Sequence, residues 1–158
     1  MPDEMFSPWR VLCVDDNELV ASALQRRMQK EPLLRWSGVV SDGSAVLQTV
    51  RDVSPDIVLM DIDMPGVDSF TLVERLAAES PDVRVLMFSG HVTSEYIDRA
   101  LNCGAWGYLS KNEDVAELLQ GVLKAARGEI ALSREATAVQ RSAFRRSGHP
   151  THPGDEAG

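Results

Sequence analysis

The chain has 158 residues, 44% of them hydrophobic and 25% charged, which suits one globular domain with a single buried core. Its net charge of −8 argues against broad electrostatic attachment to nucleic acid or anionic membranes, because both require clustered lysine and arginine. Cys13 and Cys103 offer neither a disulfide framework nor a metal-ligand spacing. No apolar run reaches the length of a membrane span, and the first residues lack the regions of a signal peptide. We therefore expect a cytoplasmic protein with no membrane contact.

Short apolar runs alternate with amphipathic segments along most of the chain. The runs predict strands over residues 11–14, 33–40, 57–60, 83–88 and 106–109. Each is followed by apolar residues at helical spacing, and the clearest helical period begins at Val115. The run 33–40 has the weakest pattern, so we expect it at an edge. Five strands alternating with five helices predict an α/β fold with a parallel sheet covered on both faces.

The composition changes after Gly128. Residues 134–146 are rich in Ala and Arg and predict a helix, so 129–146 are taken as a linker or tail helix, whereas 147–158 contain Pro, Gly and polar residues and are expected to be disordered. Residues 1–9 are taken as an N-terminal extension. The domain itself is therefore expected over residues 10–128.

Polar side chains stand where the predicted strands end. Asp15 and Asp16 follow the first strand, Asp61 the third, Ser89 the fourth and Lys111 the fifth. Because open α/β sheets bind ligands at the carboxyl ends of their strands, we expect these side chains to converge. Three adjacent carboxylates repel one another and need a neutralising cation, for which Mg²⁺ is the simplest choice. The lysine and serine then complete a pocket for a dianionic group, which predicts phosphoryl transfer to a carboxylate nucleophile.

With these residues in this order, the segment from Arg10 to Arg127 resembles the receiver domain of bacterial two-component response regulators. The resemblance implies a flavodoxin-like, doubly wound sheet of five parallel strands in the order 2-1-3-4-5. It implies that Asp61, followed by the turn Met64-Pro65-Gly66, is the phosphoacceptor. The other implied roles are Mg²⁺ binding by Asp15, Asp16, Asp61 and the backbone carbonyl of Asp63, phosphoryl transfer assisted by Lys111 and Ser89, and switching by Ser89 and Tyr108.

The resemblance implies a signalling protein and not an enzyme. A sensor histidine kinase or phosphotransfer protein would donate the phosphoryl group to Asp61. Ser89 would then bind a phosphoryl oxygen, and Tyr108 would rotate into the vacated space and remodel the face formed by the fourth helix, fifth strand and fifth helix. A homodimer formed on phosphorylation is compatible with this scheme.

Residues 107–112 and 128–133 resemble more narrowly the subfamily that carries a LuxR/NarL-type helix-turn-helix output. No such domain follows in this sequence. We expect either a stand-alone receiver or a truncated part of a longer regulator, and no DNA binding by the chain itself.

Two positions depart from the family pattern. Asn112 follows Lys111 where many receivers carry proline, and Ser69 follows Asp68 where glycine is frequent, which would alter the start of the third helix. Neither departure removes a phosphorylation group.

Other functions and roles stay open at this level. A phosphatase of the haloacid dehalogenase type could use Asp61 and Asp63 as an Asp-x-Asp pair, although Pro65 stands where such enzymes carry Thr or Val. A receiver-like interaction module that needs no phosphate is the other alternative. Tyr108 could also be a plain core aromatic, and Lys111 a solvated loop cation.

Overall fold

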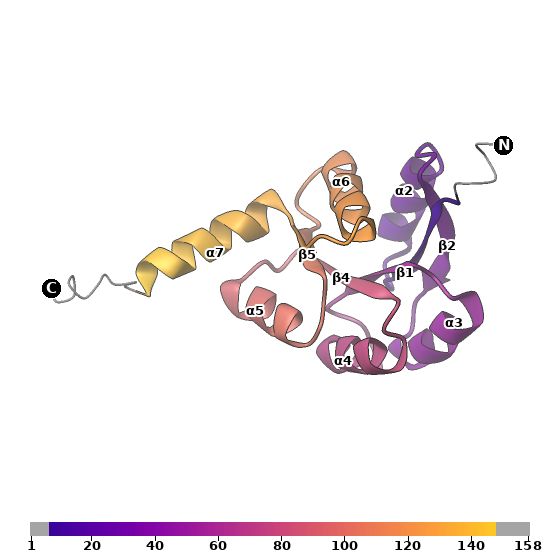
Figure 1. Cartoon of the computed structure of the whole chain (residues 1–158), viewed down its shortest axis with the longest axis horizontal. Coiled ribbons are helices and arrows are strands. Elements are labelled where there is room, and N and C mark those ends of the chain that lie inside the picture. Colours follow the sequence, from indigo (N-terminus) through magenta and orange to yellow (C-terminus); the bar gives the residue numbers. More distant parts are fainter. Residues whose placement is uncertain (1–6, 148–158) are drawn as a thin grey trace, which may run out of the picture.

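Figure 1 shows a computed structural model of the chain, in which residues 7–147 are described. A parallel sheet lies between two layers of helices, with the strand order β2-β1-β3-β4-β5-β6. The strands are β1 (Trp9–Val14), β2 (Leu34–Val40), β3 (Ile57–Asp61), β4 (Arg84–Ser89), β5 (Gly107–Ser110) and β6 (Ala131–Leu132). The edge position predicted for the second strand is confirmed, and every residue of the central strand β3 is buried.

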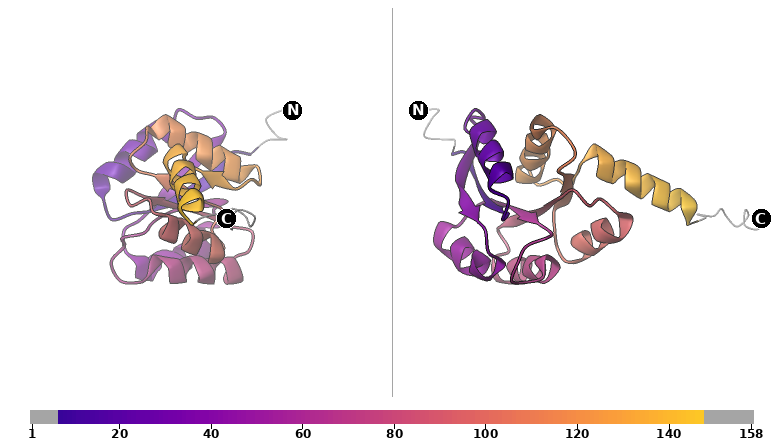
Figure 2. Two further views of the ribbon diagram at one scale, coloured as in Figure 1. Left: turned by 90° about the vertical axis from the view of Figure 1, so that its left-hand side faces the viewer. Right: turned by 180° about the vertical axis from the view of Figure 1, so that it is seen from behind.

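Helices cover both faces of the sheet, as Figures 1 and 2 show. One face carries α2 (Glu18–Met28) and α6 (Val115–Ala126), and the other carries α3 (Val46–Val53), α4 (Ser69–Glu79) and α5 (Ser94–Asn102). A short 3₁₀ turn, η1 (Gly43–Ala45), precedes α3. Each helix layer closes its own apolar cluster against the sheet. The central strands are therefore buried from both sides, which explains their unbroken apolar sequences.

The predicted number of strands is wrong, because residues 7–147 form a sheet of six strands and not five. The extra strand, β6, pairs in parallel with β5 through Gly107–Ala131 and Tyr108–Leu132. A strand of two residues is too short to show any hydrophobic period, so the sequence pattern could not reveal it. Gly107 makes the pairing feasible: a Cβ at this position would lie only 1.9 Å from the carbonyl oxygen of Ala131.

The last described helix, α7 (Arg134–Arg146), begins where Ser133 accepts a hydrogen bond from the amide of Ala136. It falls inside the segment 129–146 for which a tail helix is predicted. It follows β6 directly, and Figures 1 and 2 show it projecting from the domain, with its first part near α5. The predicted disorder of 147–158 falls almost entirely outside the described residues. Within residues 7–147, no helix is long and apolar enough to span a membrane.

Candidate functional site

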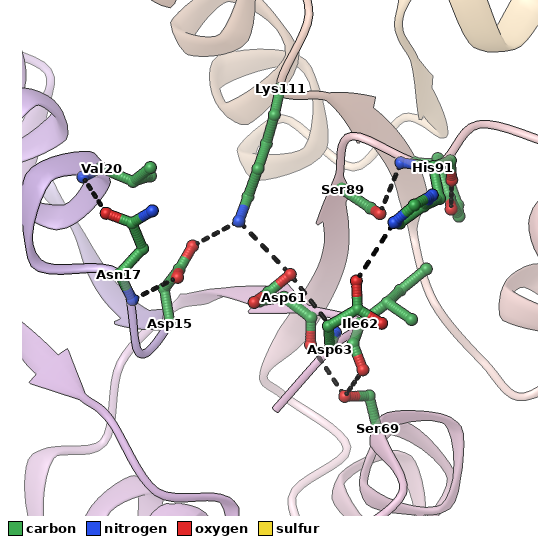
Figure 3. Close-up of polar contacts among 11 residues, drawn as sticks. Asp15, Asn17, Val20, Asp61, Ile62, Asp63, Ser69, Ser89, His91 and Lys111 are labelled. Carbon is green, nitrogen blue, oxygen red and sulfur yellow. Dashed lines mark hydrogen bonds and ion pairs between the residues drawn. The ribbon is translucent and has the colours of Figure 1, made fainter. Parts of the chain in front are cut away.

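The structure brings four predicted site residues to one edge of the sheet (Figure 3). Asp15 follows β1 and Asp61 ends β3, its neighbour in the sheet. Ser89 ends β4, and Lys111 follows β5. The parallel strand order alone therefore places three acceptors and one cation at a single edge, as the sequence predicts.

Lys111 lies between the two buried carboxylates. Its Nζ atom is 2.7 Å from Oδ2 of Asp15 and 3.3 Å from Oδ1 of Asp61. The Asp15 side chain is fully buried, and the Asp61 side chain is only 7% exposed. Lys111 also lies 5.1 Å from the ring centroid of Phe88, a distance at which an aromatic ring attracts a cation. The lysine is thus an internal counter-ion and not the solvated loop cation that the sequence left open.

The electrostatics of this cluster favour an additional positive charge. Burial raises the pKa of Asp61 above its ordinary value; the charge of Lys111 lowers it and that of Asp15 raises it further. For Lys111, burial lowers the pKa, but the hydrogen bond and charge of Asp15, with the charge of Asp61, outweigh burial and raise it. The single ammonium group of Lys111 is shared by two carboxylates, and the pKa of Asp61 therefore stays raised despite this ion pair.

The donor set fits a hard divalent cation. Asp15, Asp16 and Asp61 each offer an oxygen, and these atoms lie within 4.8 Å of one another. Asp15 Oδ2 is buried, and the ammonium group of Lys111 at 2.7 Å compensates its charge. Clustered carboxylate oxygens are the ligands that Mg²⁺ prefers. The role predicted for the carbonyl of Asp63 stays a prediction.

Ser89 and Tyr108 are linked through the loop between β4 and α5. The amide of His91 donates to Ser89 Oγ at 2.9 Å, and the Tyr108 hydroxyl donates to the carbonyl oxygen of His91. Tyr108 is completely buried, and burial raises its pKa to about 12. The Tyr108 ring lies inside the domain in this structure, and its predicted rotation into the space vacated near Ser89 stays a prediction.

Ser69 holds the backbone of the site in place, a role that was not predicted. Ser69 is buried at the start of α4, and its hydroxyl lies 2.8 Å from the carbonyl oxygens of both Asp61 and Ile62. Next to the site, His91 Nε2 lies 3.5 Å from the side chain of Asp63, and both side chains are mostly exposed. The one sequence signal for Ser69 was its departure from the usual glycine. Since Asp68 caps α4 by accepting from the amide of Thr71, the helix starts normally despite that departure.

Comparison with known proteins settles the family. The family model described as "Response regulator receiver domain" matches residues 11–123. The chain belongs to this receiver domain family. It is 28% identical to the transcriptional regulatory protein LiaR of Bacillus subtilis (strain 168) over 91% of this chain and 68% of LiaR. It is 29% identical to the nitrate/nitrite response regulator protein NarL of Escherichia coli (strain K12) over 87% of this chain and 64% of NarL.

Solved structures agree with this placement. A LuxR-family two-component response regulator from Aurantimonas sp. SI85-9A1 superimposes with a TM-score of 0.81 and 27% identity, covering 87% of this receiver and 99% of that chain. The relatives are therefore regulators of the LuxR/NarL type. The receiver matches only about two thirds of the length of LiaR and NarL, so what the remaining third of those proteins does is not carried over.

Proposed function

We propose that this chain is a phosphorylation-activated signalling receiver in which Asp61 accepts the phosphoryl group. The observation that supports it best is the placement of Asp61, a buried carboxylate at the end of β3 with Lys111 at 3.3 Å and two further carboxylates beside it. We further propose that residues 10–128 form the receiver proper and 129–146 a linker or tail.

The chemistry is an in-line displacement at phosphorus. A carboxylate oxygen of Asp61 attacks the phosphoryl group of a phosphohistidine or a small acyl phosphate. The bond from phosphorus to the donor nitrogen or oxygen breaks, and its electron pair leaves with the donor. The product is an aspartyl phosphate. Mg²⁺, held by Asp15, Asp16 and Asp61, would supply positive charge for the phosphoryl oxygens.

The neighbouring side chains have complementary tasks. Lys111, already paired with Asp61, neutralises charge that develops on the phosphoryl oxygens. Ser89 Oγ would leave the amide of His91 and donate to a phosphoryl oxygen, which moves the loop after β4. Ser69 fixes the backbone of Asp61, so the nucleophile does not drift while its side chain reacts.

The partners follow from this chemistry. A sensor histidine kinase or a phosphotransfer protein would supply the phosphoryl group in the cytoplasm, and phosphorylation could promote a homodimer. DNA binding is not expected of this chain, and would require a helix-turn-helix domain such as LuxR-type regulators carry. Its net charge of −8 also opposes non-specific attachment to DNA.

The phosphatase alternative finds no support in the arrangement of Asp63. An Asp-x-Asp phosphatase would use this side chain as an acid beside the nucleophile. Here the Asp63 side chain is 67% exposed and paired with His91, while Asp61 is paired with Lys111.

Labelling with acetyl phosphate and Mg²⁺ tests the proposal. Mass spectrometry should find one phosphoryl group per chain on Asp61, with no label in D61N and normal label in D63N. Continuous hydrolysis of a small phosphate ester that is lost in D63N would instead support the phosphatase. Absence of any label in the wild type would favour the phosphate-independent interaction module.

A further inference from the structure

The tail helix α7 is packed against the part of the domain that contains Tyr108. Ala136 is completely buried, and Val139 contacts the same apolar cluster that includes Tyr108 and Ile97 of α5. Further along α7, Gln140 donates to Asp98 of α5 at 3.0 Å. The first half of the helix therefore contacts α5 and β5, where a rearrangement at Ser89 and Tyr108 would emerge.

One carboxylate joins this helix to both loops of the phosphorylation site. Glu135 Oε1 accepts hydrogen bonds from Ser110 Oγ at 2.6 Å and from Asn112 Nδ2 at 3.0 Å. Asn112 Nδ2 also lies 3.2 Å from the carbonyl oxygen of Gly90, the residue after Ser89. We call these four residues, Gly90, Ser110, Asn112 and Glu135, the tail clamp. Its members flank Lys111 on one loop and follow Ser89 on the other.

Asn112 supplies the side-chain donor that joins the two loops of the clamp. Its position follows Lys111, where many receivers carry proline, and the proline ring offers no side-chain donor. The asparagine amide instead supplies two protons, which reach Gly90 and Glu135. The hydrogen bonds from Ser110 and Asn112 also lower the pKa of Glu135, which keeps its carboxylate ionised as an acceptor.

We propose that α7 is a phosphorylation-controlled latch: the tail clamp holds it against α5 while Asp61 is unmodified, and phosphorylation opens the clamp and frees the helix. This inference rests on the function proposed above. It adds the structural change, release of α7, by which phosphorylation of Asp61 would be signalled. The clamp depends on the relative position of two loops that phosphorylation would move.

The geometry explains the direction of this coupling. Ser89 Oγ accepts from the amide of His91, so turning it toward a phosphoryl group on Asp61 would break the hydrogen bond that spans Gly90 and release this part of the loop. Lys111, whose Nζ atom is held by Asp15 and Asp61, precedes Asn112 directly, so a change in its pairing would act on the same loop. Hydrogen bonds weaken steeply with distance and angle, so both changes act against the clamp.

Coupling between two sites is reciprocal. If phosphorylation opens the clamp, then a chain with a broken clamp must bind a phosphoryl analogue more tightly. We expect Glu135→Ala to bind beryllofluoride with Mg²⁺ about fivefold more tightly than the wild type, at the lower end of typical couplings. Glu129→Ala is the matched control, because it removes the same charge from an exposed loop outside the clamp.

Hydrogen exchange on the full chain measures directly whether α7 is held against α5 or released. In the wild type, the amides of residues 134–143 should exchange faster after beryllofluoride and Mg²⁺ are added. Glu135→Ala and Asn112→Ala should show fast exchange there before addition, and Glu135→Gln, which keeps a carbonyl acceptor, should recover most of the protection. Glu129→Ala should behave as the wild type.

The two proposals fail in different ways. If wild-type protein binds no beryllofluoride, the phosphoacceptor function itself is wrong. If it binds the analogue but exchange in α7 stays the same or slows, the latch is wrong while the function stands. Equal affinity of Glu135→Ala and the wild type for the analogue would also overturn the latch.

Discussion

At the scale of single residues, the site is a compromise between burial and charge. Asp61 must be ionised to attack phosphorus, yet it is buried next to Asp15, and both effects favour its neutral form. Lys111 offsets part of this cost without removing it. The unmodified site therefore stores electrostatic repulsion that a cation can relieve.

Replacing Asp61 by asparagine should stabilise the fold at neutral pH. The pKa of Asp61 is raised above the unfolded value of 3.8, so this carboxyl contributes stability when protonated, below pH 3.8, and loses it as the pH rises through the folded pKa. The asparagine side chain of D61N carries no charge at any pH, so D61N does not lose this stability as the pH rises. Thermal unfolding without Mg²⁺ should show a higher Tm for D61N at pH 7 by a few degrees, with a gain that shrinks as the pH falls toward 3.8.

Asp63→Asn is the control for this experiment, since it changes the same charge on an exposed side chain two residues away. Its Tm should remain close to that of the wild type at pH 7. A D61N chain that is less stable than the wild type at pH 7 would show that the ion pair with Lys111 outweighs burial.

The sequence predicts the reacting groups but not the hydrogen bonds that hold their backbone in place. Asp15, Asp61, Ser89 and Lys111 each stand at a strand end, so topology alone brings them together. The hydroxyl of Ser69 reaches back across eight residues to the carbonyl of Asp61, and no periodicity encodes such a contact. Backbone-directed bonds of this kind depend on the path of the loop, which sequence patterns do not specify.

At the scale of elements, the edge of the sheet depends on one glycine. The amides of Ala131 and Ser133 donate to the carbonyl oxygens of Trp106 and Tyr108, which makes β6 the bridge between β5 and α7. Gly107 permits this approach, because any side chain there would collide with the carbonyl group of Ala131.

Gly107→Ala should therefore detach β6. The added Cβ would lie 1.9 Å from a backbone oxygen and 2.8 Å from a backbone carbon of Ala131, and backbone atoms cannot move aside as a flexible side chain can. Overpacking of this kind costs about 2 kcal/mol of unfolding free energy. Urea unfolding should show that loss, and hydrogen exchange should show faster exchange at Ala131 and Ser133.

Gly90→Ala is a suitable comparison, because a Cβ at Gly90 would meet its nearest neighbour at an ordinary 3.8 Å. Its free energy of unfolding should change by less than about 0.5 kcal/mol. Slow exchange at Ala131 in the Gly107→Ala chain would mean that β6 tolerates the methyl group.

The longer elements were predictable for reasons that do not apply to β6. The first five strands carry apolar runs because they are buried in the sheet. The helices that follow them carry apolar residues at helical spacing because one face packs against the sheet, as in α6 over Val115–Ala126. A tail helix over 134–146 was also predictable from composition. Its docking on α5 was not, because α7 is largely polar and is held by specific contacts such as that of Gln140 with Asp98.

At the scale of the whole molecule, the site joins four neighbouring strands, so occupying it should stabilise the entire domain. Asp15 follows β1, Asp61 ends β3, Ser89 ends β4 and Lys111 follows β5. A ligand that binds only the native state adds its binding free energy to the free energy of unfolding. The acidic chain itself favours this, because a bound cation reduces the charge of the carboxylate cluster.

Beryllofluoride and Mg²⁺ together should raise the Tm of the wild type markedly. At 100 times the dissociation constant the gain is about 2.7 kcal/mol, or about 5 to 10 °C for a chain of this length. Either component alone should give a much smaller shift, since the analogue needs both the Asp61 carboxylate and the cation. The shift should vanish in D61N, shrink in K111A, and persist in D63N, whose side chain lies outside the cluster. An equal shift in D61N and the wild type would mean that the analogue binds somewhere other than Asp61.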